Sequence, residues 1–416
     1  MTRYRWVILT LLFLITTNNY LDRIVFSTLI PIIQEDLHIS TEYYSYINAA
    51  FKLAYTIGFL FMGKVVDRWG TRIGYSISIF AWSVAAALHA TARSTMQLGV
   101  WRGLLGLGES GNFPAAVKAV AEWFPAKERA LANGLFNSGT TLASIIGPPL
   151  FVWMAAVYGW RACFLVTGGT GFVLVMIWWA VYRLPEMHPS VNQAELAYIK
   201  EDAAGDAAPQ IGWMAALKFK ETWGFALAKF LTDPVWWFYL EWLPPYLYDV
   251  RRFNMAAVGW AIPVVYVTAG VGSVAGGWLS GSLIGRGWQI GTARKTAMAV
   301  CACLMPLGTL AALVPGPMLM IALVGVAAGA HQGWSANLFT TTSDIFPKQA
   351  VASLTGIGGA FGGFGGILFA SLIPGYVISH FGYTPVFICM GGLHLIAFFV
   401  VHKLLGRMKP VQMAAA

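Results

Sequence analysis

Apolar stretches, each about long enough to cross a lipid bilayer, recur along the whole of this 416-residue chain. Glycine, proline or charged residues separate them, and they fall near 6–30, 44–64, 73–92, 97–121, 130–155, 161–182, 222–247, 257–281, 295–314, 317–341, 350–378 and 384–404. Every backbone amide in lipid needs an internal partner, so continuous segments of this length are expected to be helices. The sequence therefore predicts an all-α integral membrane protein with twelve transmembrane helices.

Composition supports this class and argues against an enzyme. Only 11% of the residues are charged and 57% are hydrophobic, whereas soluble domains carry roughly 25% charge. No metal cluster, nucleophile–base pair or phosphate loop is recognisable in the sequence, so no catalytic activity, metal or cofactor is expected. The four cysteines lie in apolar stretches and form neither a disulfide framework nor a CxxC site.

Basic residues are distributed unevenly between alternate loops. If the N-terminus is cytoplasmic, 18 of the 27 lysines and arginines lie on the cytoplasmic side, four on the outer side and five within spans. This bias is the positive-inside rule, and an even number of spans returns the C-terminus to the cytoplasm. It explains the net charge of +9 without a nucleic-acid partner.

The longest polar stretch separates six predicted helices from six. We predict an N-terminal bundle at 1–183, a cytoplasmic linker at 184–221 that is partly helical near 192–203, and a C-terminal bundle at 222–416. Internal similarity supports the halves, because Glu122-Trp-Phe-Pro125 recurs as Asp344-Ile-Phe-Pro347 at an offset of 222 residues. Repeats of this kind are common in transporters.

Charged residues inside the first span need a functional reason, because each costs several kcal/mol in a membrane. Asn19, Asp22, Arg23 and Phe26 follow i, i+3, i+4, i+7 spacing and share one helix face, which is expected to look into the bundle. The alternative is that Asp22 and Arg23 simply neutralise each other.

Span four repeats this pattern, with Arg102 and Glu109 two turns apart on one face. Gly103, Gly106 and Gly108 are expected to let a neighbouring helix approach closely. A static ion pair, within the helix or to another helix, is the structural alternative. The functional hypothesis is that Asp22 and Glu109 exchange protons while the two arginines alternate between these acids and an anionic substrate. Arg23, with its planar guanidinium, is our first choice for the substrate carboxylate.

Other buried polar residues are weaker candidates. Lys52 and Tyr55 share a face of span two, although Lys52 has the alternative of reaching toward the interface. Lys229 and Asp233 are expected to pair within one helix, and Glu241 and Pro245 have no assigned role. His331 is expected either to contact substrate or to be a hydrogen-bonded core residue. The remaining candidate hydroxyl ligands are Gln332, Asn337, Asn137 and Thr140, and seven glycines between 356 and 366 predict close helix packing or a gate.

Several motifs resemble a known family over the whole chain. Gly63-Lys-Val-Val-Asp67-Arg68-Trp-Gly70-Thr-Arg72 resembles the signature loop of the major facilitator superfamily, and Arg102 with its glycines and Gly139 with Gly147-Pro148 fit its other motifs. Four segments resemble the anion:cation symporter branch, of the hexuronate and galactonate transporter type, which is similar to the sialin group. These segments are Asn19-Tyr20-Leu-Asp22-Arg23, Phe51-Lys52-Leu-Ala-Tyr55, Arg102 to Glu109, and Lys229-Phe-Leu-Thr-Asp233-Pro-Val-Trp-Trp237.

The resemblance implies two six-helix halves around a central cavity, working by alternating access in a bacterial plasma membrane as a monomer. It implies proton symport of a sugar acid, in particular a hexuronate, with Asp22 and Glu109 as coupling acids and Tyr20 and Tyr55 lining the cavity. Thr140 stands where galactonate-type members have glutamine, which favours a hexuronate over an aldonate, while an aldonate or aldarate stays an alternative substrate. Three alternative functions stay open. The first is transport of another organic anion, including an organic phosphate, and the second is drug export. The third is a membrane sensor that binds a sugar acid without transporting it.

Overall fold

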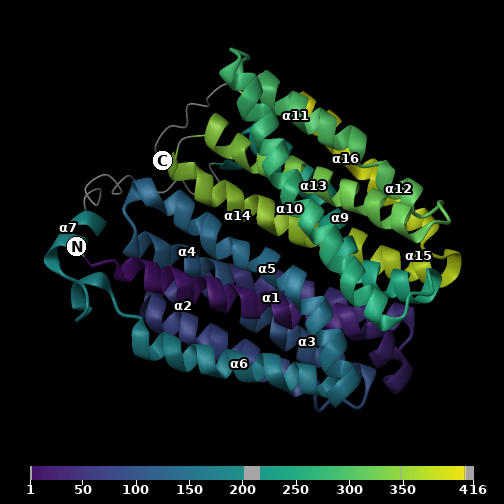
Figure 1. Ribbon diagram of the computed structural model, residues 1–416. Helices are drawn as coiled ribbons and strands as arrows, with labels where there is room; N and C mark the ends of the chain where they lie inside the picture. Colours follow the sequence, from purple (N-terminus) through teal and green to yellow (C-terminus); the bar gives the residue numbers. More distant parts are fainter. Residues whose placement is uncertain (1, 201–215, 347, 407, 409–416) are drawn as a thin grey trace. The chain divides into compact units, whose positions relative to one another are not determined.

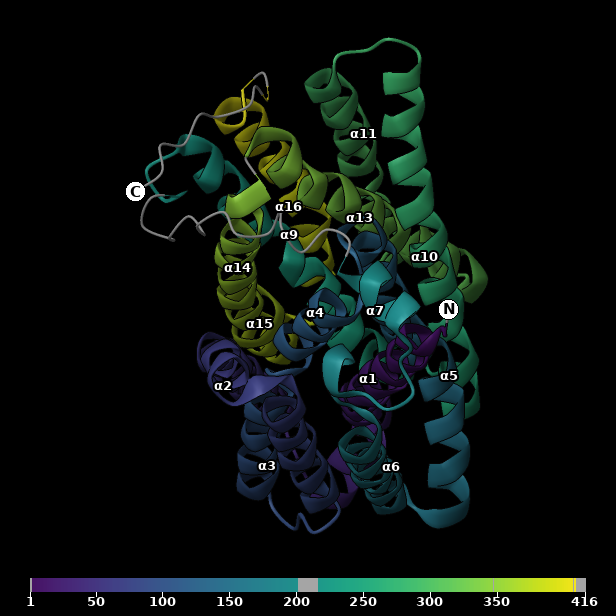
Figure 2. The ribbon, with the colours of Figure 1, turned by 90° about the vertical axis from the view of Figure 1, so that its left-hand side faces the viewer.

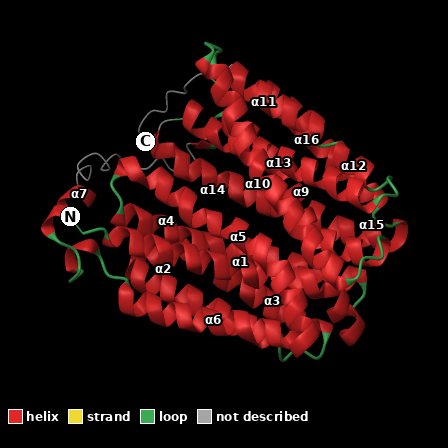
Figure 3. Ribbon diagram, viewed as in Figure 1, coloured by secondary structure: helices red, strands yellow, loops and turns green. Residues whose placement is uncertain are grey.

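The computed structural model describes residues 2–200, 216–346, 348–406 and 408, and its regular structure there is entirely helical (Figure 3). Each of the twelve predicted spans coincides with helix, which confirms the all-α prediction. Seven helical segments in the described part are long and apolar enough to cross a membrane by length and composition. The first span is not among these seven, since polar residues such as Asn19, Asp22 and Arg23 lower its mean hydropathy. The fourth span is divided into helices of 15 and 12 residues, each too short to cross a membrane alone.

Backbone contacts divide the chain into two compact units, Met1–Tyr43 with Ile47–Ala207 and Tyr44–Tyr46 with Ala208–Ala416. The helices that carry the first unit are α1 (Tyr4–Leu37), α2 (Thr41–His89), α3 (Thr95–Glu109), α4 (Asn112–Trp123), α5 (Ala126–Tyr158), α6 (Trp160–Val181) and α7 (Gln193–Ile199), with a 3₁₀ turn at Pro185–Met187 (Figure 1).

Helix α2 contains the second and third predicted spans. The two runs are joined at Gly70, whose backbone angles of φ 79° and ψ 160° are not helical. A side chain is strained at this φ, which explains why glycine stands there. The expected motif loop is therefore a one-residue interruption between two helices rather than an extended segment.

Span four is also interrupted, because α3 ends at Glu109 and α4 starts at Asn112. Ser94 caps the start of α3 by accepting a hydrogen bond from the Gln97 amide at 3.3 Å. The break places Glu109 at the C-terminal end of a helix and inside the unit at once, since its exposure is 0%. This position matters for the site below.

Helix α1 is the centre of the first unit. It packs along α5 and α6, and Figure 2 shows these two helices beside it. Asn19, Asp22, Arg23 and Phe26, which were predicted to face the bundle interior, are all buried, with exposures of 0 to 3%. The polar face of α1 is therefore turned away from lipid.

The glycines of α3 differ in what they permit. A Cβ at Gly106 would lie 2.3 Å from the Phe51 carbonyl oxygen of α2, and one at Gly108 would lie 2.7 Å from the Trp82 amide nitrogen. These two confirm the predicted close approach of a neighbouring helix. At Gly103 nothing lies within 4 Å of that position. The prediction for Gly103 is wrong, because this residue turns away from the α2 contact.

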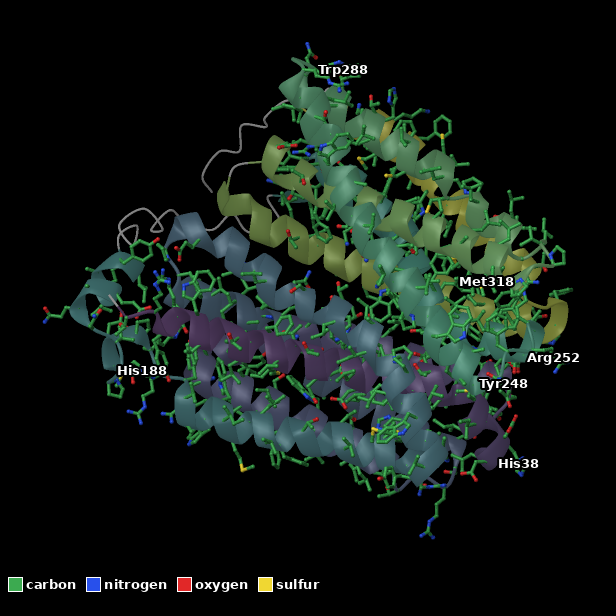
Figure 4. The ribbon with its side chains drawn as sticks, viewed as in Figure 1. His38, His188, Tyr248, Arg252, Trp288 and Met318 are labelled. Atoms are coloured by element: carbon green, nitrogen blue, oxygen red, sulfur yellow. The ribbon has the colours of Figure 1, made fainter. Side chains whose placement is uncertain are left out.

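The N-terminal segment is held by hydrogen bonds to α7, which comes near the end of the first unit in the sequence. The Glu195 carboxylate accepts hydrogen bonds from the Thr2 hydroxyl at 2.6 Å and from the backbone amides of Tyr4 at 3.0 Å and Arg5 at 3.2 Å. Arg5 also forms ion pairs with Glu195 and with Glu128 of α5. His188 lies at this end of the unit (Figure 4), with its ring 4.1 Å from that of Tyr4. Part of the predicted linker is thus packed against the first unit.

The second unit is built from a corresponding series of helices. They are α9 (Lys220–Pro245), a π-helical turn at Tyr246–Val250, α10 (Met255–Gly285), α11 (Ile290–Leu304), α12 (Leu307–Ala311), α13 (Pro317–Ile345), α14 (Lys348–Gly365), a π-helical turn at Gly366–Leu372, α15 (Ile373–Phe381) and α16 (Thr384–Leu404).

Glycine-rich contacts join the helices of this unit. The predicted close packing of the 356–366 run is confirmed at Gly358, Gly362 and Gly365, where a Cβ would lie within 2.2 Å of atoms of α9. Helices α10 and α13 approach one another through Gly272 and Gly329 in the same way. Close backbone contact of this kind leaves little room between these helices.

Candidate functional site

A buried ion pair between α1 and α3 is the central feature of the first unit. The Nε of Arg23 donates to Oε2 of Glu109 at 2.5 Å, and their side chains are 3% and 0% exposed. The two groups come from different helices, so the pair joins α1 to the end of α3. Removing one partner of such a pair would leave an uncompensated buried charge, at a cost of about 3–5 kcal/mol.

Aromatic rings surround the Arg23 guanidinium. Its central carbon lies 4.8 Å from the ring centre of Tyr20, 4.6 Å from that of Tyr55 and 5.4 Å from that of Phe51. A cation over aromatic faces is attracted by the ring quadrupole, and more strongly where water is excluded. The predicted residues Tyr20, Arg23 and Tyr55 are therefore brought together, and the rings stabilise the cation without neutralising it.

Arg102 lies beside this pair but has a different set of contacts. Its two terminal nitrogens donate to the backbone carbonyls of Asp22 and Arg23, each at 3.2 Å. Its guanidinium lies 4.8 Å from the ring centre of Phe26 and 4.7 Å from that of Phe51. Arg102 thus brings a second positive charge to the same turn of α1.

Asp22 does not form an ion pair with its neighbour Arg23, which was the alternative to a functional role for these two residues. Its Oδ2 accepts from Asn18 Nδ2 at 3.2 Å, and Asn18 in turn accepts from the Thr170 hydroxyl of α6 at 2.5 Å. The carboxyl of Asp22 is 1% exposed, and Oδ1 has no hydrogen bond within the described residues. The Asp22 carboxyl is therefore held by Asn18 and not by Arg23.

Several polar atoms around this turn of α1 are buried without a hydrogen bond. Native interiors satisfy more than 90% of such groups, so a concentration of exceptions needs an explanation. Among the described residues these atoms include Thr16 Oγ1, both side-chain atoms of Asn19, Asp22 Oδ1, Thr28 Oγ1 and Glu109 Oε1. They lie along residues 16–28 of α1 and at the end of α3.

The other candidates of the first unit lie around this cluster with fewer contacts. Lys52 of α2 is 2% exposed, which does not fit the alternative of a side chain reaching outward. On α5, Asn137 is exposed and Thr140 is half-buried, and the backbone oxygen of Thr140 accepts from Ser144. The hydrogen bonds of the described residues do not tie Asn137 or Thr140 to Arg23.

The residues of the motif loop, 63–72, have contacts other than those of the cluster around Arg23. Arg68 is exposed, and Arg72 donates to the Trp179 carbonyl at 2.5 Å while its guanidinium lies 4.5 Å from that residue's ring centre. Gly70 provides the positive φ described above. Nothing is described of the Asp67 side chain or of the surroundings of Gly63.

In the second unit, Lys229 and Asp233 form the intrahelical pair expected from their spacing. Their Nζ and Oδ2 atoms are 2.8 Å apart, and the Lys229 ammonium lies 4.1 Å from the ring centre of Phe339 on α13. Gly362 of α14 packs directly against the Asp233 carboxylate. The pair is therefore held between three helices of the unit.

His331 and Asn337 of α13 have partners within the protein. The Nδ1 of His331 lies 3.2 Å from Nε2 of His394 on α16. Asn337 donates to the carbonyls of Gly276 and Gly333, both at 2.9 Å, which favours a role in joining α10 to α13 over ligand binding. Gln332 is half-buried.

Glu241 and Pro245, which have no role assigned from the sequence, are both buried on α9. Ser371 Oγ lies 3.5 Å from Glu241 Oε2.

Sequence reasoning missed Asn18, Phe51 and His394. Asn18 lies four residues before Asp22 and bonds to it, so i, i+4 spacing counted back from Asp22 could have found it. Phe51 was quoted only as part of a motif, although it lies against both arginines. His394 is a histidine inside an apolar span, which is the same signal that identified His331.

Comparisons with known proteins agree on one family. A family model described as "Major Facilitator Superfamily" matches residues 12–370. A hexuronate transporter of Escherichia coli (strain K12) is 32% identical, with 99% of this chain and 96% of that protein covered. A galacturonate transporter of Dickeya chrysanthemi is 35% identical over 66% of this chain and 81% of that protein. A D-galactonate transporter of Escherichia coli O6:H1 is 30% identical over 98% and 97%.

Among solved structures, a similar fold is that of a bacterial homologue of the human lysosomal transporter Spinster, in an inward-facing and occupied conformation. The TM-score is 0.74 at 18% identity, with 98% of this chain and 97% of that chain covered. At this level of identity the likeness establishes the fold alone.

Proposed function

The chain belongs to the major facilitator superfamily and is a multi-pass membrane transporter, and from that premise we propose that it imports a sugar acid together with protons. We further propose that the substrate is a hexuronate, such as glucuronate or galacturonate. The hexuronate and galacturonate transporters among its relatives support this substrate class. The coupling of transport to protons is inferred instead from the contacts of the buried charged residues.

The observation that carries the proposal is the buried pair of Arg23 and Glu109. A substrate carboxylate that binds Arg23 is proposed to compete with Glu109, since Glu109 already accepts from the Nε of that guanidinium. Protonation of Glu109 weakens its hold on the arginine and frees the guanidinium for the substrate. Binding of the anion and binding of a proton therefore favour each other, and this reciprocity is the requirement for symport.

Asp22 and Arg102 extend the scheme. Arg102 holds the backbone of the Asp22–Arg23 turn, so the guanidinium of Arg23 keeps its position when its carboxylate partner changes. Asp22, with one unsatisfied oxygen, is proposed as a second proton-carrying group. The phenol hydroxyls of Tyr20 and Tyr55 and the ammonium of Lys52 are proposed to contact the sugar hydroxyls and carboxylate.

The membrane potential decides how many protons are useful. An inside-negative potential opposes anion entry by about 2.3 kcal/mol per charge per 100 mV. One accompanying proton removes this electrical cost, and two make uptake of a monocarboxylate electrogenic. Two buried carboxyls in the site, Asp22 and Glu109, allow either number.

A second substrate class is favoured by one comparison. The D-galactonate transporter of Escherichia coli O6:H1 is nearly as similar as the hexuronate transporter. Aldonates carry the same single carboxylate, so the Arg23 chemistry is unchanged, and discrimination would rest on the open chain of the sugar. Thr140 in place of glutamine favours the cyclic hexuronate.

The topology proposed with this function has both termini in the cytoplasm of a bacterium and a monomer in the plasma membrane. The two halves, 1–183 and 222–416, are proposed to alternate in access, with 184–221 as the cytoplasmic linker. Contacts of Arg5 with Glu128 and Glu195 support a linker that begins packed against the first half.

Flux into proteoliposomes tests the proposal. The purified chain is reconstituted, and uptake of radiolabelled glucuronate, galacturonate, galactonate and glucarate is measured with and without an inward proton gradient. We expect hexuronates to accumulate only with the gradient, and a protonophore to abolish accumulation. Downhill flux that ignores the gradient would contradict proton coupling, and binding without any flux would indicate a sensor.

A further inference from the structure

A side-chain amide of the first unit lies between the carboxyl of Asp22 and a hydroxyl group of another helix. Asn18 of α1 is 4% exposed, and its Nδ2 donates to Oδ2 of Asp22 at 3.2 Å. Its Oδ1 accepts from the Thr170 hydroxyl of α6 at 2.5 Å. Both ends of the amide are therefore engaged, one by a group that can change its protonation state and one by a group that cannot.

The Thr170 hydroxyl has two acceptors for its single proton. Its Oγ1 lies 2.5 Å from Asn18 Oδ1 and 2.8 Å from the backbone carbonyl oxygen of Thr167. A hydroxyl donates once and can accept as well. When the proton is directed to the Thr167 carbonyl, the same oxygen is free to accept a hydrogen bond from an N–H group of Asn18. Thr170 can therefore serve either end of the amide.

The Asn18 amide has two orientations, because turning it over exchanges its oxygen and nitrogen at nearly the same places. With Nδ2 toward Asp22, as in the structure, the amide donates to a carboxylate, which only accepts. With Oδ1 toward Asp22, two oxygens face each other, and they need a proton between them. The first orientation thus fits charged Asp22, and the second fits Asp22 with a proton on Oδ2.

Protonated Asp22 favours the second orientation. If the amide did not turn, the proton would be on Oδ1, which is buried and has no hydrogen bond within the described residues. An unpaired buried donor is costly. After the turn, Asp22 donates to Asn18, Asn18 donates to Thr170, and Thr170 donates to the carbonyl of Thr167. One of the two amide N–H groups is used in each orientation, so the comparison depends on Asp22.

Other groups influence whether Asp22 carries a proton. The charged residues that face it are Glu109, Arg102 and Arg23, and the Thr167 side chain of α6 lies beside it as well. These groups act on the carboxyl itself, whereas Asn18 can respond to the result by changing the atom that it presents.

We propose that Asn18 is a positioning residue that turns over when Asp22 gains or loses its proton, holding the charged form through Nδ2 and the protonated form through Oδ1. The proton passes between Asp22 and water, and the amide keeps its own atoms. Both states of Asp22 then have a hydrogen-bond partner, so the change between them is less costly in a buried place. The role in transport rests on the proposed function, but the orientation of the amide does not.

Solid-state nuclear magnetic resonance of the whole protein in lipid measures the orientation. Asparagine is labelled with ¹⁵N at Nδ2, and ¹³C is placed at Cγ of aspartate and Cβ of threonine. Dipolar recoupling then tells whether Nδ2 of Asn18 is closer to Asp22 or to Thr170, and the Cγ shift of Asp22 reports its protonation in the same sample. Signals that disappear in Asn18→Leu and in Asp22→Asn identify the two residues.

We expect Nδ2 to be close to Asp22 when its carboxyl is charged and close to Thr170 when the sample is acidified and the carboxyl is protonated. Nitrogen that stays beside a protonated Asp22 would overturn the proposal, and so would nitrogen beside Thr170 while Asp22 is charged. A carboxyl that keeps one protonation state from alkaline to acid pH would also overturn it, because the amide would have no change to follow.

Transport gives the second measurement. In Asn18→Leu the partner of both forms of Asp22 is lost, and we expect gradient-driven uptake to fall about three- to tenfold, the effect of losing one hydrogen bond. Counterflow exchange should change little, since it does not require Asp22 to change its protonation state, and it shows that the variant is folded.

Thr170 offers a matched pair of variants for the same assay. Thr170→Ser keeps the hydroxyl and should resemble the wild type, whereas Thr170→Val removes it and should reduce gradient-driven uptake without loss of counterflow. Equal uptake by the two variants would contradict the part assigned to Thr170. If the wild-type chain transports no sugar acid, the proposed function fails, while the resonance measurement still decides how Asn18 is oriented.

Discussion

Arg23 and Glu109 are joined through Nε and Oε2 at 2.5 Å although they lie 86 residues apart and are almost completely buried. The pair connects the middle of α1 with the last residue of α3. Because α3 stops at this residue, the carboxylate stands at a helix end, where a small change in backbone direction would move it away from the guanidinium. This gives the pair a way to separate without unfolding either helix.

Replacing Glu109 by glutamine should separate coupling from transport. Glutamine keeps the shape and a hydrogen-bond acceptor for Arg23, but it cannot release or take a proton. We expect the variant to lose accumulation driven by a pH gradient while it still exchanges labelled for unlabelled hexuronate. Counterflow and gradient-driven uptake in the same proteoliposomes measure the two activities.

Asp22→Asn is the matched comparison for that experiment. Both variants remove one buried carboxyl from the same cluster, but only Glu109 contacts Arg23. We expect Asp22→Asn to retain part of the gradient-driven uptake. Normal accumulation by Glu109→Gln would show that this carboxyl is not the coupling acid.

The ring of Tyr55 should contribute to the position of the Arg23 guanidinium, 4.6 Å away. Cation–π contacts are worth roughly 0.5–2 kcal/mol, depending on solvent exclusion. Tyr55→Leu removes the ring, and we expect KM for the substrate to rise roughly five-fold, as a loss of about 1 kcal/mol would give. Tyr55→Phe keeps the ring and tests the hydroxyl alone. If phenylalanine and leucine raise KM equally, the hydroxyl is the part that matters.

Much of the first-unit site could be predicted from the sequence, because helical spacing alone groups Asn19, Asp22, Arg23 and Phe26 on one face. The partners of these groups could not be predicted. Spacing says which residues of one helix share a face, but the pairing of Arg23 with Glu109 depends on the rotation and height of α3 relative to α1. Those quantities are set by packing of many apolar side chains along both helices.

The same limit explains the mixed outcome for the glycines. A glycine pattern predicts that a helix can be approached, and Gly106 and Gly108 are approached, but Gly103 lies on a different side of α3. The break at Gly70 lies within the predicted motif loop, which the structure shortens to a single residue. The break between α3 and α4 was not predicted, although Glu109, Ser110 and Asn112 are polar.

Gly106→Ala should disturb the contact between α2 and α3. The new methyl would lie 2.3 Å from the Phe51 carbonyl oxygen, so the helices must move apart. Overpacking of this kind costs about 1–3 kcal/mol, and we expect a lower unfolding temperature in detergent and weaker transport. Gly103→Ala is the control, since its methyl meets nothing within 4 Å. Equal unfolding temperatures of the two variants would contradict this account of the contact.

Acid should release the N-terminal segment from α7. Burial alone raises the pKa of Glu195, but hydrogen bonds from Thr2 and from the amides of Arg5 and Tyr4 outweigh it, so the pKa lies below its usual value of 4.5. A lowered pKa means that the tether is complete above pH 4.5 and is lost as the pH falls through the lowered value. Segment 2–5 should therefore become mobile only below pH 4.5.

A spin label on the exposed Arg3, as Arg3→Cys in a Cys303→Ser, Cys389→Ser background, measures this release between pH 7 and pH 3. We expect the label to be restrained at pH 7 and mobile in acid, while circular dichroism reports intact helices. In Glu195→Gln the label should be mobile at every pH. A label whose mobility does not change with pH in the parent would contradict the assignment.

The internal repeat places an arginine and an acidic residue at corresponding positions in the two halves, but we expect the energetic coupling between the two side chains to differ. Arg72 and Arg294 stand 222 residues apart, the offset that also relates Glu122 to Asp344. In the second unit Arg294 Nε lies 3.1 Å from Asp344 Oδ2, with both side chains partly buried. In the first unit Arg72 donates instead to a backbone carbonyl, while Glu122 accepts from Thr71 and Tyr182.

A double-mutant cycle for each pair tests this difference. We expect alanine substitutions at Arg294 and Asp344 to show a coupling of about 1 kcal/mol in the free energy of unfolding, because the pair is neither fully exposed nor fully buried. Substitutions at Arg72 and Glu122 should be additive, since these two residues have separate partners. Similar coupling in both cycles would mean that the repeat keeps the same ion pair in each half, and a negligible coupling at Asp344 would mean that solvent screens the contact. The repeat preserves the positions of the charges but not the side chains that face them, so the expected coupling differs between the halves although the positions correspond.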